Sequence, residues 1–260
     1  MLKNRNLYCG SFFISTYDSL YLNFNYLKFM RISNLFLFGL LLVLLVGCKP
    51  TEAANYKSSR VLKNNYIKGN SIAMYEGISD TTFVKLTDFG SDFVLDMKYA
   101  TNDNFLKQKV YDCADCYLRL KTIKFLKEAN AEFMEKGYRI KLFDCYRPLD
   151  IQKKMFELVP NADYVADPSK GSVHNRGGAV DLTLITANGK EVDMGTPFDF
   201  FGPEAGHNYQ GFSRRILKNR AYLKEVMLKH NFKAFSSEWW HYNLSESTKD
   251  KLSNFKWNCN

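Results

Sequence analysis

The alternation of strand-like and helical segments constrains the fold of this chain most strongly. Apolar residues recur at every second position, as in half-buried strands, in three segments: 93–99, 138–143 and 179–184. They recur at helical spacing in three others: 117–136, 148–158 with Pro148 at its first position, and 214–230. Gly137 is placed to end the first helix, and 232–243 fits a pair of strands. Residues 80–260 contain no repeat and no long linker, so we predict one mixed α+β domain.

An apolar run near the N-terminus predicts a targeting signal. Residues 35–46 are twelve consecutive apolar residues, preceded by Arg31 and followed by Gly47 and Cys48. A membrane-spanning helix needs about 20 such residues, so the run fits a secretory signal peptide better than a span. A buried core helix fits its position and flanks less well. The segment 45–48 also resembles a bacterial lipobox, in which the signal is removed before a cysteine that becomes lipidated.

These features predict an exported, membrane-anchored bacterial lipoprotein on the periplasmic or cell-surface face, with a lipid anchor at Cys48. Met30 is the start that gives the signal an ordinary length, so we expect the sequence before it to be an over-extended gene start or a leader. The resulting division has four parts: 1–29 as leader, 30–47 as lipoprotein signal peptide, 48–80 as lipidated cysteine and polar tether, and 81–260 as the folded domain.

The composition excludes two classes of protein and one class of partner. Hydrophobic residues make up 46% and aromatic residues 15%, which excludes a disordered or fibrous chain. The 36 Lys and Arg residues against 27 Asp and Glu give a formal charge of +9. No Lys/Arg run of the kind that binds nucleic acid occurs, so we expect a solvated basic surface and no nucleic-acid partner.

The cysteines of the folded domain indicate disulfide bonds. Beyond Cys9 in the leader and Cys48, four cysteines remain: Cys113, Cys116, Cys145 and Cys259. An even number in an exported domain predicts pairing, with three possible connectivities. The Cys113–Cys116 spacing also fits half of a zinc knuckle, but no second half completes it.

Two of the four histidines lie in unusual stretches of the sequence. His174 is seven residues before Asp181, and Gly177-Gly178 between them can form a turn that folds the imidazole back toward the carboxylate. Asp181 interrupts an apolar strand, which is costly unless its charge is held. Imidazole and carboxylate are both zinc ligands, and His241 would be a third that leaves one position open. By spacing alone, a metal site and ordinary packing are about equally supported.

Glu238 lies three residues before His241. In a regular strand this spacing would point the two side chains to opposite faces, so both serve one site only if a bulge or turn intervenes. Glu238 would then be a base that takes a proton from water, and the alternative is a surface carboxylate. Of the other histidines, we expect His207 to be structural or at the surface, and His230 to complement a helix dipole.

Arg147 follows the predicted strand 138–143 and precedes Pro148. A position between a strand end and a proline holds the backbone rigidly, so it can fix the position of a guanidinium. A guanidinium is always charged and donates in a fixed fork, which suits an oxyanion formed in acyl transfer. Taken alone, the arginine fits a surface or structural role more simply.

Five collinear motifs resemble the D-alanyl-D-alanine dipeptidases of the VanX type, within the zinc D,D-peptidases. They are 98–105, 146–148, 172–184, 194–200 and 238–242. The resemblance covers most of 90–245 and implies a compact α+β domain with a central antiparallel sheet and flanking helices.

The resemblance also implies a role for individual residues. It assigns one Zn²⁺ per chain to His174, Asp181 and His241. It makes Glu238 the general base and then the acid to the leaving amine, and Arg147 the group that stabilises the oxyanion. Three further residues match positions near the charged ends of the substrate: Tyr99, Ser172 and Asp199, the last at the free ammonium.

The activity that follows is zinc-dependent hydrolysis of D-Ala-D-Ala to two D-alanines by metal-activated water, with a small D,D-dipeptide as the partner. One alternative is a zinc D,D-carboxypeptidase or endopeptidase acting on peptidoglycan stem peptides. Another is a non-catalytic, zinc-stabilised wall-binding lipoprotein. Glu238 disfavours the last, because a structural zinc site usually fills its fourth position with protein and has no use for a base.

Overall fold

The computed structural model describes residues 74–259 of the chain. The expected leader, signal peptide, Cys48 and most of the tether lie outside these residues. Among the helices that it does describe, none combines the length and the hydropathy of a membrane span.

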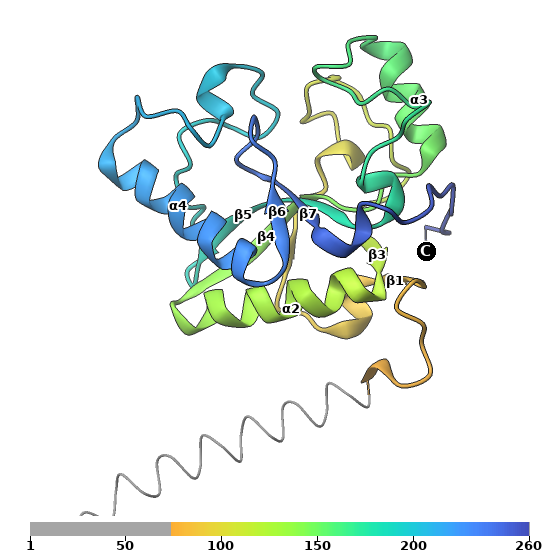
Figure 1. The fold of residues 1–260 in the computed structure, drawn as a ribbon, viewed down its shortest axis with the longest axis horizontal. Helices are drawn as coiled ribbons and strands as arrows, with labels where there is room; N and C mark the ends of the chain where they lie inside the picture. The colour runs from red at the N-terminus through yellow and green to blue at the C-terminus, as the bar shows by residue number, and fades with distance from the viewer. Residues whose placement is uncertain (1–73, 260) are drawn as a thin grey trace, which may run out of the picture. The chain divides into compact units, whose positions relative to one another are not determined.

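Within the described residues, a five-stranded mixed sheet forms the centre of the fold (Figure 1). Its spatial order is β2 (Val94–Leu95), β4 (Tyr138–Asp144), β5 (Ala179–Thr186), β7 (His241–Leu244) and β6 (Phe232–Ala234). The last four strands pair antiparallel, while β2 pairs parallel with β4 at the edge. The α+β prediction is confirmed, and the expected antiparallel sheet is extended by one parallel strand.

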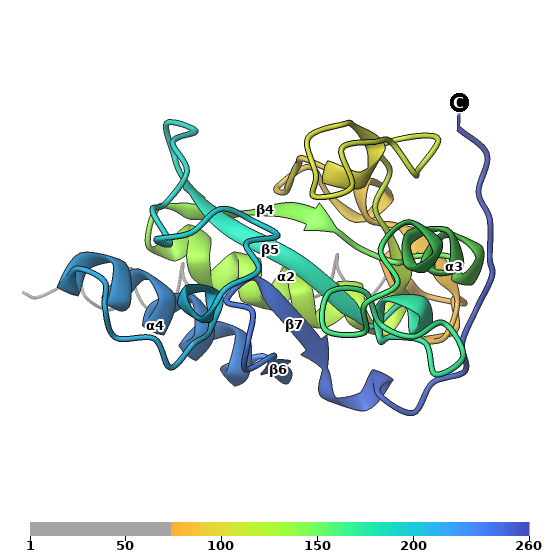
Figure 2. The same ribbon diagram turned by 90° about the horizontal axis from the view of Figure 1, so that it is seen from above.

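Helices cover the sheet and bury its apolar side chains. Helix α2 (Leu120–Glu135) packs on β4, and α4 (Arg214–Lys229) packs on β6 and against α2. Figure 2 shows α2 running behind the strands, with α4 at one end of the domain and α3 (Leu149–Leu158) at the other. Gly137 has a φ of +80° and follows the last residues of α2, so it ends the helix as predicted.

Some boundaries differ from the predictions. Residues 117–119, expected to be helical, form strand β3 (Tyr117–Arg119), which pairs with β1 (Phe83–Lys85) in a separate sheet. Residues 93–99 form only the short β2 and then a 3₁₀ helix, Lys98–Ala100. The Tyr99 carbonyl there accepts from the N–H groups of Val110 and Tyr111, so a local loop uses the backbone group that a longer strand would need. Pro148 caps α3 rather than beginning it.

Strand β5 is buried on both faces, whereas its alternation predicted a half-buried strand. Its neighbours β4 and β7 flank it, and all of its residues except the last are buried. Asp181 is therefore a buried carboxylate at the centre of the sheet, which raises the demand for partners that hold its charge.

Two disulfides join distant parts of the domain. Cys113 bonds to Cys259 and Cys116 bonds to Cys145, which selects one of the three possible connectivities. Both cysteines of the Cys113–Cys116 pair are therefore occupied, and the zinc-knuckle alternative is wrong. Cys145 directly follows β4, so one bond fixes the segment that leaves the central sheet.

Candidate active site

Strand register and a glycine turn bring the three expected metal ligands together. Asp181 on β5 and His241 on β7 are direct partners in the antiparallel pair. His174 opens a 3₁₀ helix that Gly177 ends in the left-handed region, with a φ of +73°. A Cβ atom on Gly177 would collide with the Phe83 ring. The predicted glycine turn is therefore required both by its backbone angle and by its close packing.

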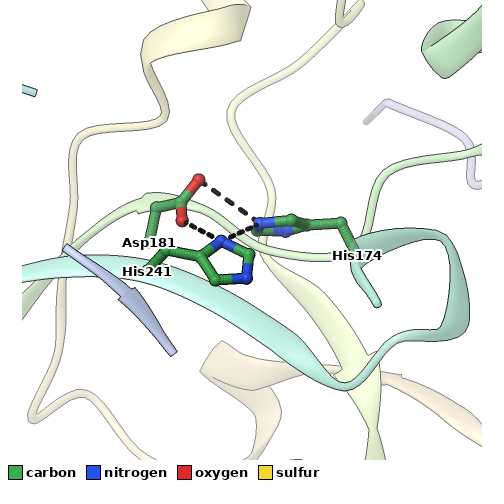
Figure 3. A group of neighbouring side chains, drawn as sticks. All are labelled: His174, Asp181 and His241. Atoms are coloured by element: carbon green, nitrogen blue, oxygen red, sulfur yellow. Dashed lines mark hydrogen bonds and ion pairs between the residues drawn. The ribbon is translucent and has the colours of Figure 1, made fainter. Parts of the chain in front are cut away.

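Figure 3 shows the three side chains pointing toward one another. His241 Nδ1 lies 3.0 Å from Asp181 Oδ1, and His174 Nε2 lies 3.4 Å from Asp181 Oδ2. The two ring nitrogens are 3.1 Å apart. Ligand atoms from all three residues lie within 4.8 Å of one another, so they form a candidate metal site.

Hydrogen bonds on the far side of each ring prepare it for a metal ion. His174 Nδ1 lies 2.6 Å from the Cys145 carbonyl, which only accepts, so we assign the proton to Nδ1. His241 Nε2 likewise donates to Asn243 Oδ1 at 2.9 Å. The facing nitrogens thus present lone pairs beside a carboxylate, an arrangement that a bound cation stabilises. Two imidazole nitrogens and one carboxylate oxygen fit a divalent metal ion with an open coordination position.

The electrostatics keep Asp181 ionised. Burial opposes its charge, but the imidazoles of His174 and His241 outweigh burial and hold the pKa of the carboxyl well below its usual range. Burial would lower the pKa of His241, but without a metal ion Asp181 accepts a hydrogen bond from the protonated Nδ1 and raises this pKa above the ordinary value. A metal ion that binds here would take the place of that proton.

Glu238 reaches the same site from the turn between β6 and β7. Glu238 lies in that turn and not in a strand, so its side chain can face the same site as His241 despite the three-residue spacing. Its Oε2 is 3.9 Å from His241 Nδ1. Burial raises the pKa of the Glu238 carboxyl, and the nearby Asp181 charge adds to the shift. The result is a carboxylate that binds a proton more readily than a surface one does.

A second carboxylate in this region, the half-buried Asp199, is held by Tyr99. The Tyr99 hydroxyl donates to both Asp199 oxygens at 3.1 Å. Burial, followed by the charge of Asp181, raises the pKa of Asp199 well above its usual value. Asp199 also has a φ of +58°, in the left-handed region that aspartate tolerates better than most residues.

Arg147 is fixed by a buried network. Its Nε and Nη2 donate to Asp144 Oδ2 at 3.1 and 2.6 Å, and its Nη1 donates to Gln152 Oε1 at 3.0 Å. Burial opposes the charge, but Asp144 holds the pKa of Arg147 well above its usual value. Sequence reasoning missed Asp144 and Gln152, although Asp144 stands three residues before Arg147 in the same stretch.

The eight predicted catalytic, metal-binding and substrate-binding residues all line one cavity of about 300 Å³. They are Tyr99, Arg147, Ser172, His174, Asp181, Asp199, Glu238 and His241. His207 and His230 do not line it. His207 lies against the Tyr242 ring, and burial lowers the pKa of His207 to about 4. His230 follows the last turn of α4 and contacts Glu132 at 2.8 Å.

Three metal-ligand side chains, an adjacent half-buried carboxylate and a fixed guanidinium around one cavity define a metal-dependent hydrolase. The profile of a peptidase family described as D-Ala-D-Ala dipeptidase matches residues 79–257. The chain belongs to this family of metallopeptidases.

Individual relatives carry the same description. The chain is 32% identical over 183 residues to a D-alanyl-D-alanine dipeptidase of Escherichia coli K12, covering 70% of this chain and 95% of the relative. It is 33% identical over 174 residues to a D-alanyl-D-alanine dipeptidase of Enterococcus faecium, covering 58% of this chain and 85% of that relative. Among solved structures, a Zn(II) complex of the vancomycin-resistance D,D-pentapeptidase VanY matches with 15% identity and a TM-score of 0.32, covering 50% of this chain and 74% of that one.

Proposed function

We propose that this protein hydrolyses free D-Ala-D-Ala to two D-alanines, with one Zn²⁺ held by His174, Asp181 and His241. The observation that carries the proposal is the convergence of these three ligands with Glu238 and Asp199 in one cavity of about 300 Å³. The relatives named D-alanyl-D-alanine dipeptidase support the choice of substrate, because this chain spans 95% and 85% of their lengths.

A zinc ion in this site would supply Lewis-acid chemistry, polarising the scissile carbonyl and making water more acidic. Glu238 takes the proton from the attacking water and later returns it to the leaving amine. Its raised pKa suits both steps, because a group that gains and then loses a proton works best with a pKa closer to neutrality.

Arg147 stabilises the charge that develops on the carbonyl oxygen. A guanidinium has five N–H groups, and the bonds to Asp144 and Gln152 use three of them. Arg147 lines the cavity, so its other two N–H groups can be directed at substrate. An aligned donor that is already held in place contributes roughly 3–4 kcal/mol to such a transition state.

The Tyr99–Asp199 pair receives the free ammonium of the dipeptide. Without a cation beside it, burial favours the neutral form of Asp199. An arriving ammonium lowers the pKa of this carboxyl, so binding creates an ion pair at Asp199. Ser172 lines the same cavity and is proposed to contact the other charged end of the substrate.

We propose that the domain works outside the cytoplasm, anchored through Cys48. Two disulfides support an oxidising compartment, where such bonds persist. Metabolic labelling with a radioactive fatty acid tests the anchor: the full chain should be labelled, and the Cys48→Ala variant should not. Labelling of the variant would contradict the assignment of Cys48.

The activity is tested by following D-alanine release from D-Ala-D-Ala, using the chain from residue 49 with zinc, with chelator and with chelator followed by zinc. We expect release that the chelator abolishes and zinc restores. Release from a peptidoglycan pentapeptide but not from the free dipeptide would instead indicate the carboxypeptidase alternative. Zinc binding without hydrolysis of either peptide would indicate the wall-binding lipoprotein.

A further inference from the structure

Two aromatic side chains from different loops stack on each other at the active-site cavity. Tyr164 lies in the loop between α3 and His174, and Phe201 lies in the loop after Asp199. Their ring centroids are 4.3 Å apart, and both residues line the cavity. Tyr164 nevertheless remains 47% exposed and Phe201 37% exposed. Core packing therefore does not account for this pair, which we call the aromatic bridge.

The loop that carries Tyr164 is fixed to the catalytic network. Val165 is buried beside it, and the carbonyl of Ala166 accepts from Gln152 Nε2 at 2.8 Å. The other end of the Gln152 amide accepts from Arg147 at 3.0 Å. One buried glutamine therefore holds both the arginine and the loop.

The loop that carries Phe201 is fixed as well. The Phe201 ring packs edge-on against Phe105 at 4.9 Å. Further along the loop, Ala205 is buried, and its carbonyl accepts from the backbone N–H of Trp239 at 3.0 Å. With both loops anchored, the bridge is a preformed wall of the cavity.

The bridge borders the end of the cavity that holds Asp199. Phe105 contacts Phe201 on one side and the Tyr99 ring on the other, at 6.2 Å. The Tyr99 hydroxyl donates to Asp199, which stands two residues before Phe201. Under the proposed function, this is the end that receives the free ammonium of the dipeptide.

We propose that the Tyr164–Phe201 bridge is the specificity determinant that restricts the enzyme to free dipeptides. This inference rests on the proposed function. A substrate with a further residue on its amino group would have to extend beyond Asp199, where the two rings close the cavity. Removing the rings opens that path, and Asp199, which burial already favours as a neutral acid, can then face an amide instead of an ammonium.

The test is the ratio of kcat/KM for N-acetyl-L-Lys-D-Ala-D-Ala to that for D-Ala-D-Ala, using the zinc-loaded chain from residue 49. In the Tyr164→Ala/Phe201→Ala double variant we expect the ratio to rise at least about tenfold, through a lower KM for the longer peptide. Tyr164→Ala alone should raise it less. Tyr164→Phe, which keeps the ring, should leave it unchanged.

Phe200→Ala is the matched control, because Phe200 is 38% exposed in the same loop but does not line the cavity. Its ratio should equal that of the wild type. An unchanged ratio in a double variant that still cleaves the dipeptide would overturn the bridge proposal alone. If the double variant does not fold, an unchanged ratio in Tyr164→Ala has the same meaning. A wild type that is inactive on both peptides would overturn the proposed function, and the bridge proposal with it.

Discussion

The floor and the rim of the cavity are built in opposite ways. The floor consists of ionisable side chains on or beside the sheet, with His174 and Asp181 each 3% exposed and Arg147 7% exposed. The rim consists of uncharged rings on loops, left partly in water. A buried charge must be paired, so the floor residues hold one another in a network. The rings have no such requirement. The floor therefore fixes the chemistry of the site, whereas the rim can change with the size of the substrate.

The largest effect should follow from removing the general base, Glu238, from the cavity floor. Glu238→Gln keeps the shape of the side chain but cannot take a proton, so kcat on D-Ala-D-Ala should fall about 10⁴-fold, the upper end for one acid–base group. Bound zinc, measured by elemental analysis, should not change. The exposed Glu157 on α3 provides the control, because Glu157→Gln should retain full activity. Retained activity in Glu238→Gln would refute the role of Glu238.

Removing either disulfide should lower the stability of the domain, but only one of the two removals should also lower its activity. Cys113–Cys259 spans 146 residues and Cys116–Cys145 spans 29. In the chain-entropy model, their loss through paired Cys→Ser changes costs roughly 5 and 3.6 kcal/mol of unfolding free energy. Only loss of the Cys116–Cys145 bond should also reduce activity, because this bond fixes the segment whose Cys145 carbonyl positions His174. Denaturant unfolding and kcat/KM check this, and equal losses of activity in both variants would contradict it.

Arg147→Lys should have the next largest effect. Lysine keeps the charge but loses the fork that grips Asp144 and Gln152, so kcat should fall roughly 10²- to 10³-fold. KM should change much less, because the interaction develops in the transition state. Arg215→Lys, at an arginine side chain that is 76% exposed, is the control and should be neutral. A change confined to KM would assign Arg147 to ground-state binding instead.

The smallest effect concerns His207, in the loop that carries the rim residue Phe201. Burial lowers the pKa of His207 from 6.5 to about 4, so between these values the unfolded chain binds the proton more readily. Stability should therefore fall as the pH falls from about 6.5 to 4, by at most about 1.4 kcal/mol per pH unit for one proton. His207→Gln should flatten this part of a plot of unfolding free energy against pH. An unchanged slope would show that other groups cause it.

The floor could be predicted from the sequence far better than the rim. His174 and Asp181 are separated by a glycine turn that local chemistry explains, and the family resemblance supplies His241 and Glu238. Tyr164 stands in a loop without periodicity, and its stacking partner lies 37 residues further along the chain. Only the tertiary structure brings such a pair together.

Two other misses have physical origins of their own. The alternation in 93–99 predicts a strand, but hydrogen bonds from Val110 and Tyr111 use the Tyr99 carbonyl. The cysteines allow three pairings, because a flexible chain closes loops of very different lengths at similar entropic cost. The strand prediction therefore failed on contacts from a neighbouring loop, and the pairing stayed open because only the tertiary structure places the four cysteines.

The nested order of the disulfides has a consequence for how the protein is made. Among the four cysteines of the folded domain, Cys113 and Cys116 emerge first during synthesis, Cys145 follows and Cys259 emerges last. Pairing in order of appearance would join Cys113 to Cys116 and Cys145 to Cys259, and the native protein contains neither bond. A Cys113–Cys116 or Cys145–Cys259 bond that forms must be exchanged before the native pairs are complete, a reaction that takes seconds to hours depending on oxidant and isomerase. Recombinant yield should thus depend on disulfide isomerase more than on oxidant.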